Sequence, residues 1–180
     1  MPTVFSHAIA GAALARTIRA EDARKLMIAA VISAMVPDLD AIGFMTGVPY
    51  GSFFGHRGFT HSITFAVLWS ALVTVLLFRK APWPAALLLF LATVSHPLLD
   101  MLTSGGLGCT LFAPFNNERL FFPWQPIKVS PLGFGFFSAR GLAVLASEAV
   151  WVVLPSVILL LVTKRRRSAC KAPSPNNGPG

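Results

Sequence analysis

The sequence predicts an all-α integral membrane protein, a bundle of about five membrane segments, some broken at proline, with one long aromatic loop outside. Hydrophobic residues fill 54% of the 180 positions, the mean hydropathy is +0.67, and only seven residues are acidic. The apolar residues form runs close to the roughly 20 residues that a helix needs to cross a bilayer. Most basic residues lie between these runs, on one expected side of the membrane.

The apolar runs can be followed in order along the chain. Residues 3–20 are short and amphipathic, and we expect them to enter the bilayer as a tilted or partial helix. Residues 26–44 form a second segment, which the sequence PDLD interrupts. Residues 59–78, 82–102 and 142–163 are mostly apolar and long enough to cross the bilayer. No basic region precedes an apolar one at the N-terminus, so we expect no cleavable signal peptide.

Membrane topology explains the net charge of +8. In a soluble protein this charge would suggest nucleic-acid binding, because clustered cations release counterions from phosphates. Five segments with the N-terminus outside put 11 of the 15 basic residues inside, as the positive-inside rule requires. Four segments, with residues 3–20 on the inner surface, would distribute the charges identically. We therefore expect membrane lipid, and no nucleic acid, as a partner. The outer basic residues are Arg57, Arg119, Lys128 and Arg140.

The chain is expected to form one membrane domain followed by a tail. Residues 1–163 contain every apolar segment and make up the membrane-embedded domain. Residues 164–180 begin with KRRR and are then rich in Pro, Asn and Gly, so we expect a basic, disordered tail on the cytoplasmic side. Cys109 and Cys170 then lie on opposite sides of the membrane, and we expect no disulfide between them.

Ionisable residues collect within the apolar segments or at their borders. Such residues are costly at membrane depth unless they are paired, solvated or bound to an ion. Four histidines and three aspartates share this placement: His7, Asp38, Asp40, His56, His61, His96 and Asp100. With the N-terminus outside, all seven fall in the outer half of the bundle. The four-segment alternative would leave His7 on the inner side, so we prefer five segments.

The spacing of these residues predicts their local geometry. His96 and Asp100 are four residues apart, so they share one face of a helix. His56 and His61 are five apart with a glycine between them. We expect His56 in a turn, Thr60 as the N-cap of the next helix and His61 in its first turn.

A metal site follows from the chemistry of these side chains. Pro37 is expected to break the second segment beside Asp38 and Asp40, and broken helices at membrane depth often line polar binding sites. Neutral imidazoles and carboxylates are suitable ligands for zinc, manganese or iron, and seven such groups suffice for one or two ions. We expect a divalent metal as the cofactor, with zinc as the first candidate.

Hydrolysis is the reaction that such a metal site predicts. A bound metal lowers the pKa of its water towards 7 and polarises a carbonyl or phosphoryl oxygen. We expect metal-activated water to attack a phospholipid or another membrane-associated ester, with a catalytic set of Asp38, His61, His96 and Asp100. A metal or proton transporter or channel using the same cluster is the alternative, and a metal-stabilised scaffold is a third. The case for serine catalysis is weaker than the case for metal catalysis, because adjacency in sequence does not give the spatial contact that a Ser-His-Asp triad needs. Three serines adjoin histidines: Ser6, Ser62 and Ser95.

Four motifs carry a family resemblance: SHAIAG, PDLD, HRGFTHS and SHPLLD. In this order they resemble the signature motifs of the membrane-bound metal-dependent hydrolases, the LexA-regulated inner-membrane hydrolase family of bacteria. The resemblance covers residues 7–133, including the outer loop. It implies a bacterial inner-membrane protein, metal-dependent hydrolysis and a ligand set of His7, Asp38, His56, His61, His96 and Asp100. Asp40 would either bridge two ions or hold a ligand histidine from behind.

Several residues near the cluster have two interpretations. Arg57 either extends to lipid headgroups, which we prefer, or binds a substrate phosphate. Glu148 is either a buried hydrogen-bonding partner or an addition to the site. Residues 103–141, rich in phenylalanine and proline, form either a lid over the site or an aromatic belt at the interface, with Arg119 and Lys128 as candidate phosphate contacts.

The division of basic residues predicts the topology directly. A reporter fused after Gly180 should be cytoplasmic, and one inserted in residues 103–141 should be outside, because the inner segments carry most of the positive charge. Paired activity reporters that work on one side of the membrane measure this. A C-terminus found outside would contradict the convergence of the seven polar residues.

Overall fold

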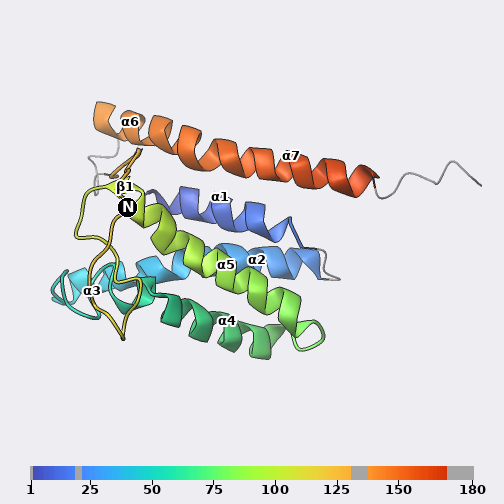
Figure 1. Ribbon diagram of the computed structural model, residues 1–180, viewed down its shortest axis with the longest axis horizontal. Helices are drawn as coiled ribbons and strands as arrows, with labels where there is room; N and C mark the ends of the chain where they lie inside the picture. Colours follow the sequence, from blue (N-terminus) through green and yellow to red (C-terminus); the bar gives the residue numbers. More distant parts are fainter. Residues whose placement is uncertain (1, 19–21, 131–137, 170–180) are drawn as a thin grey trace, which may run out of the picture.

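The computed structural model describes residues 2–18, 22–130 and 138–169 and is mostly helical. The helices lie side by side, and α6 and α7 form one long helix along an edge of the bundle (Figure 1). In chain order the elements are α1 (Val4–Ala15), α2 (Ala23–Met35), η1 (Val36–Ala41), α3 (Ile42–Met45), η2 (Phe59–His61), α4 (Ile63–Leu77), α5 (Pro82–Met101), β1 (Thr103–Ser104), β2 (Ile127–Lys128), α6 (Ala139–Glu148), η4 (Ala149–Val153) and α7 (Leu154–Ala169).

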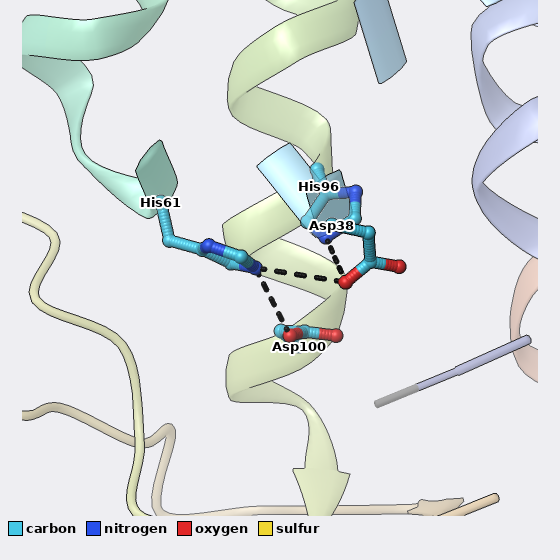
Figure 2. Close-up of side chains that lie close together, drawn as sticks. All are labelled: Asp38, His61, His96 and Asp100. Carbon is cyan, nitrogen blue, oxygen red and sulfur yellow. Dashed lines mark ion pairs between the residues drawn. The ribbon is translucent and has the colours of Figure 1, made fainter. Parts of the chain in front are cut away.

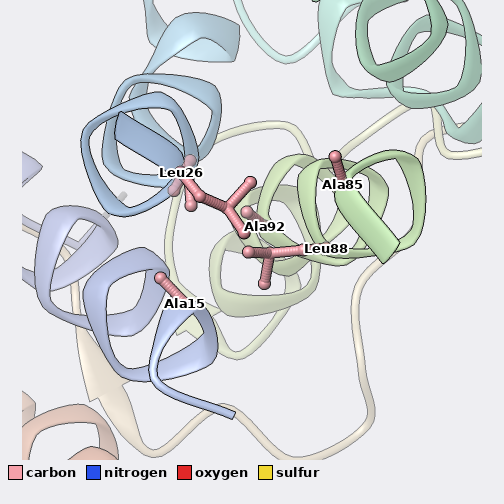
Figure 3. Close-up of a cluster of buried hydrophobic side chains, with 7 residues drawn as sticks. Ala15, Leu26, Ala85, Leu88 and Ala92 are labelled. Atoms are coloured by element: carbon pink, nitrogen blue, oxygen red, sulfur yellow. The ribbon is translucent and has the colours of Figure 1, made fainter. Parts of the chain in front are cut away.

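Small side chains form the core between α1, α2 and α5. The buried cluster, part of which Figure 3 shows, consists mainly of alanines. At Gly11 of α1, an added Cβ would lie 2.9 Å from the carbonyl oxygen of Ala30 and 2.9 Å from Cβ of Ala34. Small residues allow helix backbones to approach closely, as they do in membrane proteins. The cluster comprises Ala15, Leu26, Ala30, Ala34, Ala85, Leu88 and Ala92.

Large apolar side chains point outwards from the bundle. Leu68, Leu72 and Leu76 of α4 are each more than half exposed, and Leu161 of α7 is too. Among the described residues, two helical stretches are long and apolar enough to cross a membrane, Pro82–Met101 and Ala139–Arg165, while α1 and α4 are shorter apolar helices. A fold with alanines inside and leucines outside suits an apolar surrounding better than water.

The helix boundaries show which local predictions hold. α2 ends at Met35 and the chain continues as the 3-10 helix η1, so the break at Pro37 is confirmed. His56 lies in a turn, as predicted. The predicted N-cap was wrong, because Ser62 and not Thr60 caps α4: the Ser62 hydroxyl accepts a hydrogen bond from the Phe65 N–H.

The last helix continues beyond its predicted end. It runs from Ala139 through a π-helical turn to Ala169, so residues 164–169 are helical where disorder was predicted. A run of lysine and arginine is compatible with helix, since both residues have good helix propensity. The predicted tail from residue 170 onward, including Cys170, lies outside the described residues, as do residues 131–137 of the loop.

The loop after α5 is ordered over residues 103–130 and attached to the turns that carry His56. β1 and β2 pair in parallel, and the backbones of Cys109 and Leu120 form an isolated antiparallel β-bridge. The Arg119 guanidinium donates to four carbonyl oxygens, those of Tyr50, Ser52, His56 and Gly108. Arg119, predicted as a candidate phosphate contact, therefore has a structural role: its hydrogen bonds hold the loop against the segment before η2.

The α1–α2 contact yields a stability prediction. Gly11→Ala should lower the free energy of unfolding by about 1–3 kcal/mol, because the new Cβ would press on the α2 backbone. Gly51→Ala is the control, since the nearest atom to a Cβ there is Leu107 Cδ1 at 3.8 Å. Thermal unfolding in detergent measures both variants. Equal midpoints for the two would contradict the close packing of α1 on α2.

Candidate metal centre

Four separate parts of the chain bring the predicted cluster together at one end of the bundle. α1 carries His7, and η1 carries Asp38 and Asp40. His56 lies in the turn before η2 and His61 in η2, while α5 carries His96 and Asp100 one turn apart on its buried face. In Figure 2 the side chains of Asp38, His61, His96 and Asp100 point towards one another. This end of the bundle is the one to which β1, α3 and the N-terminus belong (Figure 1).

Four of these residues form an inner set with the spacing of metal ligands. Asp38 Oδ1 lies 3.3 Å from His96 Nε2 and 3.9 Å from His61 Nε2, and His61 Nε2 lies 3.6 Å from Asp100 Oδ2. One ligand atom from each of the four lies within 4.8 Å of all the others. His61, His96 and Asp100 are fully buried, and Asp38 is the most exposed member, at 9% of its side chain.

The inner set is short of hydrogen bonds. Within the described part of the chain, Nε2 of His61, Nε2 of His96 and all four oxygens of Asp38 and Asp100 are buried without a hydrogen-bond partner. Burying unpaired carboxylates is costly unless a cation compensates them. The donor set, imidazole nitrogens with carboxylate oxygens, fits zinc, manganese or iron.

Partners behind the histidines orient them towards the centre. His96 Nδ1 is 2.7 Å from the carbonyl oxygen of Ala34, which can only accept, so Nδ1 carries the proton and Nε2 has a free lone pair. His61 Nδ1 is 3.1 Å from Asp40 Oδ2. A histidine held in this way presents its other nitrogen as a metal ligand.

Asp40 occupies the position behind the ligands, one of its two predicted alternatives. Its Oδ1 is 2.6 Å from His56 Nδ1, and its Oδ2 accepts from the Thr60 hydroxyl and the Arg57 N–H. Asp40, His56 and His61 are also close enough together to hold an ion. Both Asp40 oxygens already have partners, however, so the inner set is the better centre and His56 stands behind it.

His7 lies at the edge of the inner set. Its ring stacks on that of His96 with centroids 3.7 Å apart, and its Nε2 is 3.7 Å from Asp100 Oδ1. Among the described residues, neither ring nitrogen of this fully buried histidine has a hydrogen-bond partner. The structure thus brings His7 to the centre from α1 and leaves it available as a ligand.

The position of Arg57 differs from the interfacial one that we preferred for it. It does not extend to headgroups: the side chain is 1% exposed, and its Nε lies 2.8 Å from Asp100 Oδ2, without the geometry of a hydrogen bond. Burial acts to lower the pKa of Arg57, but the Asp100 carboxylate and other neighbouring groups together outweigh burial, so the pKa lies above its ordinary value. A permanent cation therefore adjoins the inner set, which residue spacing alone does not predict.

Glu148 is a buried hydrogen-bonding partner, the first of its two predicted roles, and not an addition to the site. Its carboxylate accepts from the Thr3 N–H at 2.6 Å, from the Thr3 hydroxyl at 2.5 Å and from the Ser6 hydroxyl at 2.7 Å. It therefore binds the first turn of α1, where backbone N–H groups have no helical partner. Glu148 holds the start of α1, and with it His7, from the π-helical junction of α6 and α7.

The remaining candidate nucleophiles are engaged elsewhere. The Ser6 hydroxyl bonds Glu148, that of Ser62 caps α4, and that of Ser95 donates to the Ala92 carbonyl. None of these bonds, over the residues that the structure describes, joins a serine to a histidine. The Cys109 thiol is buried against the Pro97 carbonyl, and burial raises its pKa, so it remains a protonated packing group.

Comparison with known proteins places the chain among inner membrane proteins. Residues 1–168 match the family model described as YdjM inner membrane protein. The chain is 39% identical over 173 residues to the inner membrane protein YbcI of Escherichia coli (strain K12), a match that covers 93% of this chain and 100% of the relative. No solved structure gives a significant match.

These matches confirm the predicted inner-membrane placement. Both descriptions name an inner membrane protein and state no activity. The metal-dependent hydrolase that the four motifs suggested is therefore a matter for proposal. The chain belongs to the YdjM inner membrane protein family.

Proposed function

We propose that this protein is a metal-dependent hydrolase of the bacterial inner membrane that cleaves a phospholipid or another membrane-associated ester. One observation carries the proposal: six buried nitrogen and oxygen atoms of Asp38, His61, His96 and Asp100 converge without hydrogen-bond partners among the described residues. Three carboxylates, those of Asp38, Asp40 and Asp100, lie in or directly behind this cluster, and Arg57 pairs with Asp100. A divalent cation would compensate the remaining charge.

The inner set would hold this cation, with His7 in reach as a further ligand. A divalent ion, zinc first and manganese or iron as alternatives, lowers the pKa of its water and withdraws charge from an ester oxygen. The protein's own residues prepare that chemistry. Asp40 and the Ala34 carbonyl hold the rings of His61 and His96, so little reorganisation is needed.

Asp38 is the residue best placed to move a proton. Its Oδ1 faces the two histidines, and neither of its oxygens has a hydrogen-bond partner in the described structure. Figure 2 shows one oxygen of Asp38 directed away from the three ion pairs. As the most exposed member of the set, Asp38 can accept the proton that a nucleophilic water must lose.

We also propose that five segments enter the membrane, with the site at the outer end. The outward leucines of α4 and α7 support contact with lipid. The loop over residues 103–130 exposes Phe115 to 89% and Trp124 to 56%, and such rings partition to the headgroup layer. A site beneath this loop would meet esters at the membrane surface.

Transport by the same cluster is the competing function, and the packing disfavours it. A transporter needs a path from its site to the other side of the membrane. Towards the far ends of α1, α2 and α5, that space is filled by buried Ala15, Leu26 and Ala85. The site is therefore open to one end of the bundle at most.

Metal content tests the proposed centre. His61→Ala should lose most of its bound metal. Asp40→Asn should bind the metal about 10- to 100-fold more weakly, because the Asp40 carboxylate no longer orients the ring of His61. Asp22→Asn, an exposed aspartate before α2, is the matched control and should keep full occupancy. Elemental analysis of detergent-purified protein gives the stoichiometry. Full occupancy in His61→Ala would exclude the inner set as the metal site.

Ester cleavage in detergent separates catalysis from transport. Asp100→Asn keeps the size of the side chain but removes its charge, so cleavage should fall at least about 100-fold relative to the parent and Asp22→Asn. A panel of phosphate and carboxylic esters gives the rates. Metal or proton flux in sealed vesicles, without cleavage of any panel ester by the parent, would instead favour a transporter.

A further inference from the structure

We propose that Arg57 binds the phosphoryl group of the substrate, so that the ester cleaved is a phosphate ester. The inference rests on the proposed function and names its substrate class. The Arg57 guanidinium is buried beside the inner set and has unused hydrogen-bonding capacity there.

Arg57 is only partly engaged by its neighbours. Nη1 donates to the Gly105 carbonyl at 2.8 Å, and Nε pairs with Asp100. Within the described residues, Nη2 is buried and has no hydrogen-bond partner. Nε and Nη2 share one edge of the planar guanidinium, so Nη2 faces the same side as the Asp100 carboxylate. The unused donor thus lies next to the proposed metal ligands.

The backbone holds Arg57 in this position at some cost. Its φ is 62°, in the left-handed region that residues other than glycine seldom adopt. Its N–H donates to Asp40 Oδ2, and its carbonyl accepts from the Thr110 N–H at 3.0 Å. Strained conformations that are fixed from both sides are concentrated at functional sites.

The loop after α5 leaves room for the guanidinium. Gly106 has a φ of 86°, and a Cβ at this position would lie 2.8 Å from Arg57 Nη1 and 2.8 Å from the Tyr50 hydroxyl. A larger residue would displace the arginine head. The loop therefore approaches Arg57 with bare backbone, and Nη1 is anchored to it through Gly105.

The donor chemistry of Arg57 favours a phosphate ester over a carboxylic ester. Asp40 adds a third negative charge behind those of Asp38 and Asp100, so a divalent ion and Arg57 together would balance the carboxylates when the histidines are neutral. An arriving phosphate would then meet no excess negative charge. Guanidinium N–H groups form strong, charge-assisted hydrogen bonds to phosphoryl oxygens, and weaker ones to the uncharged oxygens of a carboxylic ester.

A simpler role for Arg57 would be to neutralise Asp100. A lysine could supply that charge, but it could not present a second donor along the guanidinium edge. Arg57→Lys therefore distinguishes phosphate binding from neutralisation. Arg57→Gln removes the charge altogether, and Arg140→Gln removes an exposed arginine expected on the same side of the membrane as a matched control.

The test measures phosphate binding and metal content on the same metal-loaded, detergent-purified proteins. Calorimetric titration with inorganic phosphate measures binding of free phosphate. Capture of micelles that contain phosphatidic acid measures binding of lipid phosphate, and micelles that contain diacylglycerol, which has no phosphate, are the comparison. We expect the parent and Arg140→Gln to bind a phosphate probe. Arg57→Lys and Arg57→Gln should bind it about 10- to 100-fold more weakly, with Arg57→Lys keeping its metal.

The outcomes separate this inference from the proposed function. Binding of phosphatidic acid alone, or of inorganic phosphate as well, supports the inference with a lipid or a free phosphate ester as the source. Parental affinity in Arg57→Lys, or loss of metal from it, overturns the inference and leaves Arg57 as a partner of Asp100. A parent protein without metal overturns the proposed function itself.

Discussion

The burial of two carboxylates in an apolar helical bundle is the constraint on which the rest of this structure depends. Asp38 and Asp100 converge at one point, and Asp100 is fully buried. Removing one such charge from water costs several kcal/mol unless another charge compensates it. Arg57 supplies one compensating charge. The histidines direct lone pairs to the same point, so a cation bound there would balance the remaining charge.

The surrounding structure positions these few atoms. Pro37 ends α2 so that η1 can turn Asp38 inward while Asp40 reaches back to the histidines. Glu148 fixes the first turn of α1, and Gly11 lets α1 lie close to α2. Arg119 joins the loop after α5 to the turns before η2. Each of these features lies at the end of the bundle that holds the inner set, or on a helix that carries a residue of the cluster.

Local spacing in the sequence is enough to predict part of this site. His96 and Asp100 share a face because they are four residues apart in a helix, and Pro37 breaks a helix because it lacks an N–H. Topology then predicts all seven polar residues at one end. The structure brings the seven together there, with the inner set and His7 at the centre and Asp40 and His56 behind them. These predictions succeed because each depends on neighbours in the chain or on the order of the segments.

Other features depend on contacts between distant residues, which spacing does not contain. Arg57 is buried because Asp100 and Gly105 meet it from another part of the chain, so an interfacial position was the wrong expectation. Thr60 resembles an N-cap, but its hydroxyl bonds Asp40 and leaves the cap to Ser62. The choice between the two roles of Asp40 likewise required knowing which atoms it touches.

X-ray absorption spectroscopy of the purified, metal-containing protein tests the central claim most directly, because it reports the atoms around the metal. Our account predicts a first shell of nitrogen and oxygen at about 2.0–2.2 Å for zinc, with the outer-shell scattering of at least two imidazole rings, from His61 and His96. A sulfur shell at about 2.3 Å, or a metal without imidazole scattering, would contradict it.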